Sequence, residues 1–221
     1  MVFKFFAYRD WAINSIDCSQ LSGEIFKNPQ KINWQKLSNQ NFVFVFIGWS
    51  WIVPSSFVQN ELCLCFHPSD LPEYRGGSPI QHQVIDGVEN TFASMFRMTE
   101  LVDDGPVLAK VPINLSGSIS DIFGELTRSA KLCLNILSVM DDLGERCDAQ
   151  KINTRSVGDL RRRRTSEMSI ITLTELEEMS FRQRCDFIRC QQSPYPVAKL
   201  KLRDGTYVTL SGAVDESNDD T

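Results

Sequence analysis

One of the two histidines in the sequence lies at the end of an apolar run, where a predicted strand gives way to a loop. His67 closes the run LCLCFH and precedes PSDLPEYRGGSP, a stretch rich in proline and glycine. Such a loop lets the backbone approach a ligand closely, because glycine has no Cβ. An imidazole also exchanges protons near neutral pH. We therefore predict an acid–base or hydrogen-bonding role for His67, with a histidine that only caps the loop as the alternative.

The alternation of Cys63, Cys65 and His67 raises a second possibility, a zinc site completed by His82. Alternate residues of a strand share one face, and cysteine and histidine are common zinc ligands. The Cys-x-x-Cys spacing typical of such sites is missing, however, and cysteines on a strand are commonly plain core residues. We expect no metal here.

A second candidate loop, LVDDGPVL, places Asp103 and Asp104 directly before Gly105. Aspartate and glycine are favoured in tight turns, because aspartate bonds to its own backbone and glycine adopts unusual dihedral angles. Considered alone, the two carboxylates indicate a turn and no specific chemistry.

Together, FHPSDLPEYRGGSPIQ and the later VDDGPVL resemble the paired signature of folate-dependent formyltransferases, the family of methionyl-tRNA formyltransferase and glycinamide ribonucleotide transformylase. FVFVFIGWSWIVP is similar to the folate-side strand and loop of that family. YRDWA, RGGSPIQ, RRRRTSEMS and FIRCQQSPYPVA resemble segments of its sugar N-formyltransferases, in particular the pseudaminic-acid-type group that acts on UDP-4-amino-4,6-dideoxy-N-acetyl-altrosamine. The resemblance covers nearly the whole chain.

This resemblance implies an enzyme that transfers a formyl group from 10-formyltetrahydrofolate, without a metal. The acceptor would be the primary amine of a nucleotide-linked amino sugar, of the UDP-4-amino-4,6-dideoxy-N-acetylhexosamine type used for surface polysaccharides. The amine would attack directly, through a tetrahedral intermediate whose oxyanion the protein stabilises. Two alternatives stay open: a formyltransferase with another amine acceptor such as aminoacyl-tRNA, and a non-catalytic folate or nucleotide-sugar binding protein.

The catalytic roles also follow from the resemblance. His67 would donate to the oxyanion or move a proton, and Asp103 would orient His67, contact the folate and accept the proton of the amine. The family has asparagine two residues before the histidine, whereas this chain has Cys65, a weak hydrogen-bond donor. We expect a backbone N–H or a water to substitute for the missing amide.

The binding residues implied by the resemblance fall into two groups. The pterin of the folate would lie against Trp49, Trp51 and Val53, which are otherwise ordinary core residues. The nucleotide-sugar would meet arginines that pair with its diphosphate and aromatic rings that stack on its base; the candidates are Tyr8, Arg9, Arg75 and Tyr195. The run Arg161 to Arg164 either contacts phosphate or is a solvated segment.

Hydrophobic patterns indicate an α/β fold, and the resemblance makes it a Rossmann-like formyltransferase sandwich with a mostly parallel mixed sheet. VFKFFAY, NFVFVFIGW and LCLCF read as buried strands, and TFASMFRM with VLAKVPI as an antiparallel pair. Helices are predicted over WAINSIDCSQL, over the short PSSFVQN, over SPIQHQVIDG and, most clearly, from Ser118, where Ser118 and Asp121 can form a capping box.

We divide the chain into a formyltransferase catalytic domain, 1–145, and a small C-terminal extension, 146–214. The extension begins with a basic loop that lacks apolar periodicity, followed by a helix around Phe181, Cys185 and Ile188. A β-hairpin with an Asp204–Gly205 turn closes it. The acidic residues 215–221 are expected to be a disordered tail.

Composition limits the partners and the compartment. The formal net charge of −5 leaves no broad basic footprint for nucleic acid. The N-terminal apolar run is too short for a signal peptide, and no apolar stretch approaches the ~20 residues of a membrane helix. Seven cysteines, an odd number, fit a reducing compartment. We therefore expect a cytoplasmic protein that binds no nucleic acid and no membrane; a homodimer is suggested by the family alone.

Overall fold

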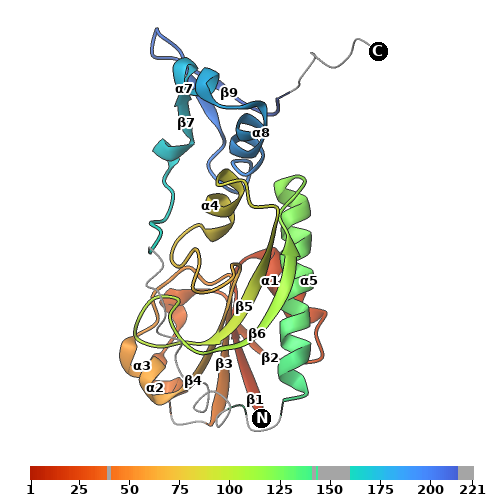
Figure 1. Cartoon of the computed structure of the whole chain (residues 1–221). Coiled ribbons are helices and arrows are strands. Elements are labelled where there is room, and N and C mark those ends of the chain that lie inside the picture. Colours follow the sequence, from red (N-terminus) through yellow and green to blue (C-terminus); the bar gives the residue numbers. More distant parts are fainter. Residues whose placement is uncertain (39–40, 141–142, 144–159, 214–221) are drawn as a thin grey trace.

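The structure is a computed structural model that describes residues 1–38, 41–140, 143 and 160–213. Figure 1 shows a main body built on one sheet, with a smaller unit formed by the C-terminal residues at one end. The expected domain boundary near residue 145 and the expected tail at 215–221 both lie outside the described residues.

The main sheet has six strands in the order β2-β1-β3-β4-β5-β6. Its first four strands are parallel, and β5 runs antiparallel to β4. The strands β5 and β6 form the predicted antiparallel pair. The central strands are continuous apolar runs because both of their faces are covered. The strands are β1 (Val2–Phe6), β2 (Gly23–Phe26), β3 (Phe42–Ile47), β4 (Leu62–His67), β5 (Asn90–Arg97) and β6 (Val107–Asn114).

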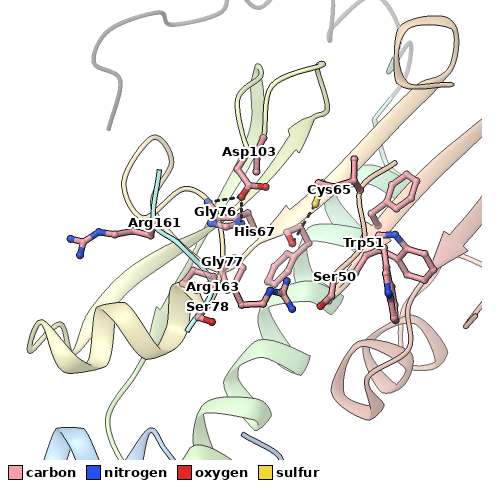
Figure 2. A pocket seen from close by; sticks show the side chains of 18 of the residues that line it. Ser50, Trp51, Cys65, His67, Gly76, Gly77, Ser78, Asp103, Arg161 and Arg163 are labelled. Carbon is pink, nitrogen blue, oxygen red and sulfur yellow. Dashed lines mark hydrogen bonds and ion pairs between the residues drawn. The ribbon is translucent and has the colours of Figure 1, made fainter. Parts of the chain in front are cut away.

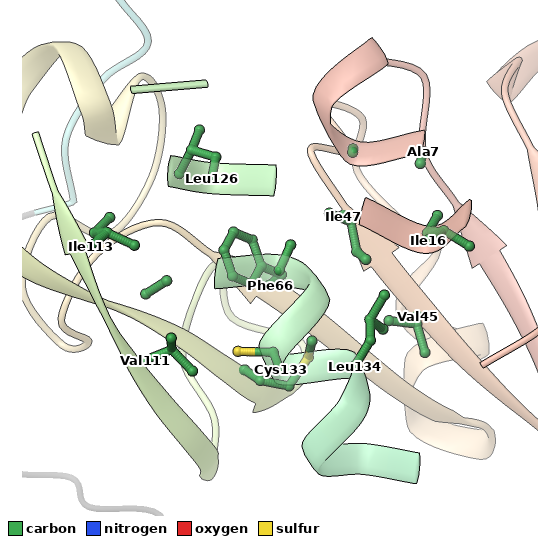
Figure 3. Packing of buried hydrophobic residues seen from close by; sticks show 14 of the residues in the cluster. Ala7, Ile16, Val45, Ile47, Phe66, Val111, Ile113, Leu126, Cys133 and Leu134 are labelled. Atoms are coloured by element: carbon green, nitrogen blue, oxygen red, sulfur yellow. The ribbon is translucent and has the colours of Figure 1, made fainter. Parts of the chain in front are cut away.

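Helices cover the two faces of this sheet in separate layers. One face packs against α1 (Asp10–Asp17) and α5 (Ile119–Ser138), where Leu126, Cys133 and Leu134 meet strand residues such as Phe66 (Figure 3). The other face packs Phe6, Phe44 and Phe46 against the short helices α2 (Trp34–Leu37) and α3 (Ser55–Asn60). Alternation along each strand thus assigns one set of side chains to each layer.

The helix predicted from Ser118 begins as expected. Ser118 accepts a hydrogen bond from the Asp121 backbone N–H, and the Asp121 carboxylate accepts one from the Ser118 N–H at 2.8 Å, which completes the capping box. The helix α4 (Pro79–Ile85) has proline at its start and Gly87, with φ +81°, just after its end, also as predicted.

The C-terminal extension contains more structure than the sequence analysis predicted. The hairpin of β8 (Lys199–Lys201) and β9 (Tyr207–Thr209) is present with Gly205 at φ +86°, and the predicted helix is α8 (Phe181–Arg189). A third strand, β7 (Ile170–Thr172), pairs in parallel with β8 and was not predicted. The other unpredicted elements are β2, α2, α7 (Leu173–Glu178) and the 3-10 turns η1 (Pro29–Lys31) and η2 (Ser166–Ser169).

The extension is fastened to the main body at the end of α8. The Arg189 guanidinium donates to the carbonyls of Leu115 and Gly117 at 2.6 and 2.9 Å, and it pairs with Asp186 at 2.7 Å. Cys190 is fully buried and belongs to the same hydrophobic cluster as the sheet and α5. Among the described residues, no helix is both long and apolar enough to cross a membrane.

Candidate active site

A cleft of about 650 Å³ opens where the parallel strands β3 and β4 end. In open α/β sheets, ligands bind outside the carboxyl ends of the strands, because the loops there converge. Loops from four parts of the chain form its walls: residues 48–53 and 55 after β3, 76–81 at the start of α4, 98–103 before β6, and 160, 161, 163 and 164 with 194–196 from the extension. The cleft size is typical of a small-molecule site.

His67 and Asp103 meet in this cleft, as predicted. The His67 ring is 5% exposed, and its Nδ1 lies 3.4 Å from Asp103 Oδ2 (Figure 2). Its Nε2 lies 3.0 Å from the carbonyl oxygen of Tyr74, so both ring nitrogens face acceptors. Asp103 has φ +47°, in the left-handed region that is costly for a residue with a Cβ. The turn therefore holds a strained backbone that aims the carboxylate at the histidine.

A second set of contacts joins the glycine loop to the Asp103 turn. Asp103 Oδ2 accepts the Gly76 N–H at 2.8 Å. The Arg75 side chain donates from Nε and from its guanidinium to the Val102 carbonyl at 3.1 and 2.8 Å. Arg75 therefore links the glycine loop to the turn that contains Asp103. Unlike the predicted nucleotide-sugar residues Arg9 and Tyr195, it does not line the cleft.

Cys65 lines the cleft, two residues before His67 on β4. Burial raises the pKa of its thiol well above the usual range, and the nearby charges of Asp103 and Cys63 act in the same direction. The thiol is therefore neutral at physiological pH. It is a small, weakly polar group where an amide donor was expected.

Aromatic rings form the wall that follows β3. Trp49 and Trp51 both line the cleft with their ring centroids 4.7 Å apart, and Val53 is buried beside them. Tyr8 backs this wall: its ring lies 4.5 Å from Trp51 and its hydroxyl 2.7 Å from Ser50 Oγ. The Trp49 indole N–H is buried without a hydrogen-bond partner among the described residues. An orphan donor and apolar surfaces fit a flat, polar-edged ring such as a pterin.

The predicted residues Arg9 and Tyr195 come together on the opposite side. The Arg9 guanidinium lies 5.5 Å from the centre of the Tyr195 ring and 5.1 Å from that of Tyr8. Arg9 and Tyr195 line the cleft, whereas Tyr8 supports it from behind. Three of the four predicted nucleotide-sugar residues are therefore neighbours.

The basic run lies along the glycine loop. Arg161 pairs with Gly76 as an isolated parallel bridge, and its backbone exchanges hydrogen bonds with Arg75 and Gly77 at 2.8 and 2.9 Å. The Arg164 N–H reaches Ser78 Oγ at 3.1 Å. The backbone of this run is thus paired with the glycine loop, while the side chains of Arg162 and Arg163 are exposed.

Two residues of the cleft were not singled out from the sequence. Gln81 on α4 is 3% exposed and lines the cleft, yet its side chain has no hydrogen bond to any described residue. Arg163 was considered only as part of a charge run. Paired glycines at 76 and 77 were the available signal, because two residues without a Cβ allow another backbone to approach.

The His and Cys residues near β4 do not form a group with three or more metal ligands. No cluster of this kind, from His, Cys, Asp or Glu, occurs within the described ranges. His82 points instead to the basic run, with its Nε2 2.9 Å from the Arg162 carbonyl.

The part of the chain that contains Cys65, His67 and Asp103 is similar to a known protein family. Residues 26–127 match the formyl transferase family. The matched segment contains Cys65, His67 and Asp103 together with the glycine loop, while Arg9, Arg163 and Tyr195 lie outside it.

Curated proteins that are similar to part of this chain include methionyl-tRNA formyltransferases. The protein of Rickettsia prowazekii is 30% identical over 129 residues, which cover 55% of this chain and 42% of the relative. That of Rickettsia typhi is 32% identical with the same coverage. The chain thus spans less than half the length of the curated relatives it matches.

Solved formyltransferase structures confirm the predicted fold class. A methionyl-tRNA formyltransferase from Clostridium thermocellum has a TM-score of 0.75 at 23% identity, covering 95% of this chain and 97% of the other. A 4-N formyltransferase from Francisella tularensis has a TM-score of 0.75 at 19% identity, covering 98% and 99%. HypX from Aquifex aeolicus, solved with tetrahydrofolic acid, has a TM-score of 0.70 at 18% identity and covers 91% and 36%.

Proposed function

We propose that this chain transfers the formyl group of 10-formyltetrahydrofolate to a primary amine, and that the amine belongs to a nucleotide-linked amino sugar. The observation that carries the reaction class is the His67–Asp103 pair, with 3.4 Å between Nδ1 and Oδ2, inside the segment that matches the formyl transferase family. Bound 10-formyltetrahydrofolate would supply the formyl carbon: the bond from this carbon to the amine would form, its bond to N10 would break, and tetrahydrofolate would leave with a proton at N10.

The chemistry requires a neutral amine and a stabilised oxyanion. Asp103 accepts the proton that the amine loses, directly or through water, because its carboxylate already points into the cleft. His67 donates to the developing oxyanion from Nε2, which must leave the Tyr74 carbonyl to do so. The Nδ1 contact with Asp103 holds the ring in place during that exchange.

The folate half of the cleft is assigned to Trp49, Trp51 and Val53. Their apolar surfaces and the unpartnered Trp49 N–H suit a pterin, and Asp103 lies at the boundary with the reacting centre. The Cys65 thiol fills space in the cleft but is a weak hydrogen-bond donor, so a water or a backbone N–H takes the place of the missing amide donor.

A sugar acceptor is favoured by the aromatic and cationic cluster of Tyr8, Arg9 and Tyr195. It is also favoured by two of the similar structures, each covered almost completely: the sugar N-formyltransferase from Shewanella and the 4-N formyltransferase from Francisella tularensis. We propose the UDP-4-amino-4,6-dideoxy-N-acetylhexosamine type, in a cytoplasmic enzyme that forms a homodimer.

Aminoacyl-tRNA is the second candidate acceptor, because the curated relatives are methionyl-tRNA formyltransferases. The net charge of −5 favours the smaller acceptor, since binding of tRNA relies on neutralising many phosphates.

One experiment separates these acceptors. Purified protein is mixed with 10-formyltetrahydrofolate and either a panel of UDP-linked 4-amino-4,6-dideoxy sugars or methionyl-tRNA, and the products are analysed by mass spectrometry. We expect an enzyme-dependent formyl mass increment on a sugar. Formylation of methionyl-tRNA alone would replace the sugar proposal, and folate binding without any product would indicate a non-catalytic binding protein.

A further inference from the structure

The extension contributes to the wall of the cleft an arginine, Arg163, that forms no ion pair with a described residue. Arg163 is exposed and lines the cleft, and its guanidinium has no hydrogen bond or ion pair with any described side chain or carbonyl. Figure 2 shows its side chain extending toward the Ser50 side of the cleft. Arg161 extends the other way, where it pairs with Asp86 at 3.2 Å and lies over the Tyr74 ring.

The backbone of Arg163 is fixed from both sides. The flanking contacts join Arg161 to Gly77 and Arg164 to Ser78. A Cβ added at Gly77 would lie 2.5 Å from the Cα of Arg163 and 2.6 Å from its backbone N, so the loop and the basic run touch with no space between them. Because the backbone is already fixed, binding of an anion would have to order only the side chain of Arg163.

Arg9 supplies a second cation on the same side. Burial raises the pKa of Tyr195, while the positive charges of Arg9 and Arg163 oppose this effect, so both guanidinium groups act on one phenol. The acidic residues that line the cleft, Glu100 and Asp103, belong to the separate turn before β6. The extension side of the cleft is therefore positively charged.

Gln81 adds a polar side chain from α4 to the same cleft. The residue is 3% exposed and lines the cleft, and its amide has no hydrogen bond to a described residue, so it is free to bond a ligand or water there.

We infer that Arg163 and Arg9 together bind the diphosphate of the acceptor, and that the glycine loop serves to hold Arg163 in that position. Two guanidinium groups match the two charges of a diphosphate and can bond its oxygens in pairs. The inference rests on the proposed function in taking the acceptor to be nucleotide-linked. It gives the basic run a binding role and makes the extension part of the site.

The test compares two neighbouring arginines. Arg163→Ala removes the guanidinium from the cleft, whereas Arg162→Ala removes an exposed arginine that does not line it. Binding of UDP, inorganic pyrophosphate and uridine is measured by calorimetry on the full chain. We expect Arg163→Ala to weaken UDP and pyrophosphate binding about tenfold or more, as for loss of a charged hydrogen bond, and Arg162→Ala to change it less than about twofold.

Four further outcomes are informative. Equal UDP affinity in wild type and Arg163→Ala would overturn the inference, as would a UDP affinity that falls equally in both arginine variants. Formylated sugar formed by a protein whose UDP affinity is insensitive to Arg163 would overturn the inference and leave the proposed function standing. UDP binding that depends on Arg163, with no formyl transfer to any amine, would support the binding role of Arg163 and overturn the proposed function.

Discussion

The two sides of the cleft are built in different ways. His67 and Cys65 lie at the end of β4, in the layer where buried side chains on both faces fix the strand. Arg163 and Tyr195 come from irregular segments of the extension, and contacts across loops hold them in place. The comparison teaches that the reacting groups are positioned by the core, whereas Arg163 and Tyr195 are positioned by contacts between irregular segments and their neighbours. Damage to the first side should lower kcat, and damage to the second should raise KM.

The largest effect is expected at the reacting pair. Asp103→Asn removes the proton acceptor and His67→Ala removes the donor, so each should lower kcat about 100- to 10,000-fold. Asp104→Asn is the matched control, because Asp104 is the neighbouring carboxylate and does not line the cleft. Steady-state formyl transfer, with circular dichroism to check folding, measures the effect. Near wild-type kcat in the first two variants would contradict the mechanism.

A smaller effect, on KM, is expected at the glycine loop. Gly77→Ala would place a Cβ 2.5 Å from the Cα of Arg163 and push the basic run away. We expect KM for the acceptor to rise about tenfold with kcat changed far less, as for loss of one charged contact. Gly124→Ala is the control, since no atom lies within 4 Å of its added Cβ, and it should raise stability by up to about 1 kcal/mol. If Gly77→Ala lowered kcat and left KM unchanged, the assignment of kcat to one side of the cleft and KM to the other would be wrong.

The effect at Cys65 should be smaller again. Burial raises the pKa of this thiol, which keeps it protonated through neutral and mildly alkaline pH. Cys65→Ala should therefore lower kcat less than about tenfold, below the cost of a lost oxyanion donor. The pH profile of kcat should keep its shape, because no thiolate contributes to it. Loss of an alkaline limb in the variant profile would show that the thiol ionises during turnover.

The smallest expected effect is on stability. It involves two buried thiols, that of Cys133 in the main body and that of Cys190 in the extension. Burial raises the pKa of Cys133 and of Cys190 to about 12, so both stay protonated in the folded state when the unfolded thiols ionise near pH 9. The folded state then binds more protons, and the free energy of unfolding falls as pH rises above about 9, by at most about 1.4 kcal/mol per pH unit for each thiol.

Denaturant unfolding at pH 8 and pH 10 measures this slope. Cys133→Ala lowers stability at both pH values through the cavity that it leaves, so the slope is the informative quantity. We expect a shallower fall between pH 8 and pH 10 in this variant. An unchanged slope would mean that the Cys133 thiol does not contribute.

The sequence predicted the elements whose signals are local. Continuous apolar runs marked the central strands, and Ser118 with Asp121 marked the start of α5. The His67–Asp103 meeting was also expected, because the family resemblance paired their two loops. The short strands β2 and β7 were missed, since three or four residues carry too little pattern and are strands only because a neighbour pairs with them.

The contacts of the basic run were unpredictable for a different reason. The pairing of Gly76 with Arg161 joins residues far apart in the chain, and neither segment has a periodic pattern. The contact of Arg75 with Val102 likewise depends on how two loops meet. Long-range contacts between irregular segments leave no periodicity in a single sequence, so the resemblance assigned Arg75 to the ligand while the structure shows it holding a loop.

The position of the basic run also bears on protein synthesis. The ribosome makes residues 62–114 well before residues 160–164, so the segment that holds His67 and Asp103 is available for folding first. Arg163 reaches the glycine loop only when the later part of the chain has left the exit tunnel. A translation product that stopped after α5 would retain the groups proposed to act on the formyl donor and lack Arg163 and Tyr195, two of the groups proposed to bind the acceptor. Full recognition of the acceptor would therefore begin only after the chain is complete and the extension has packed against the main body.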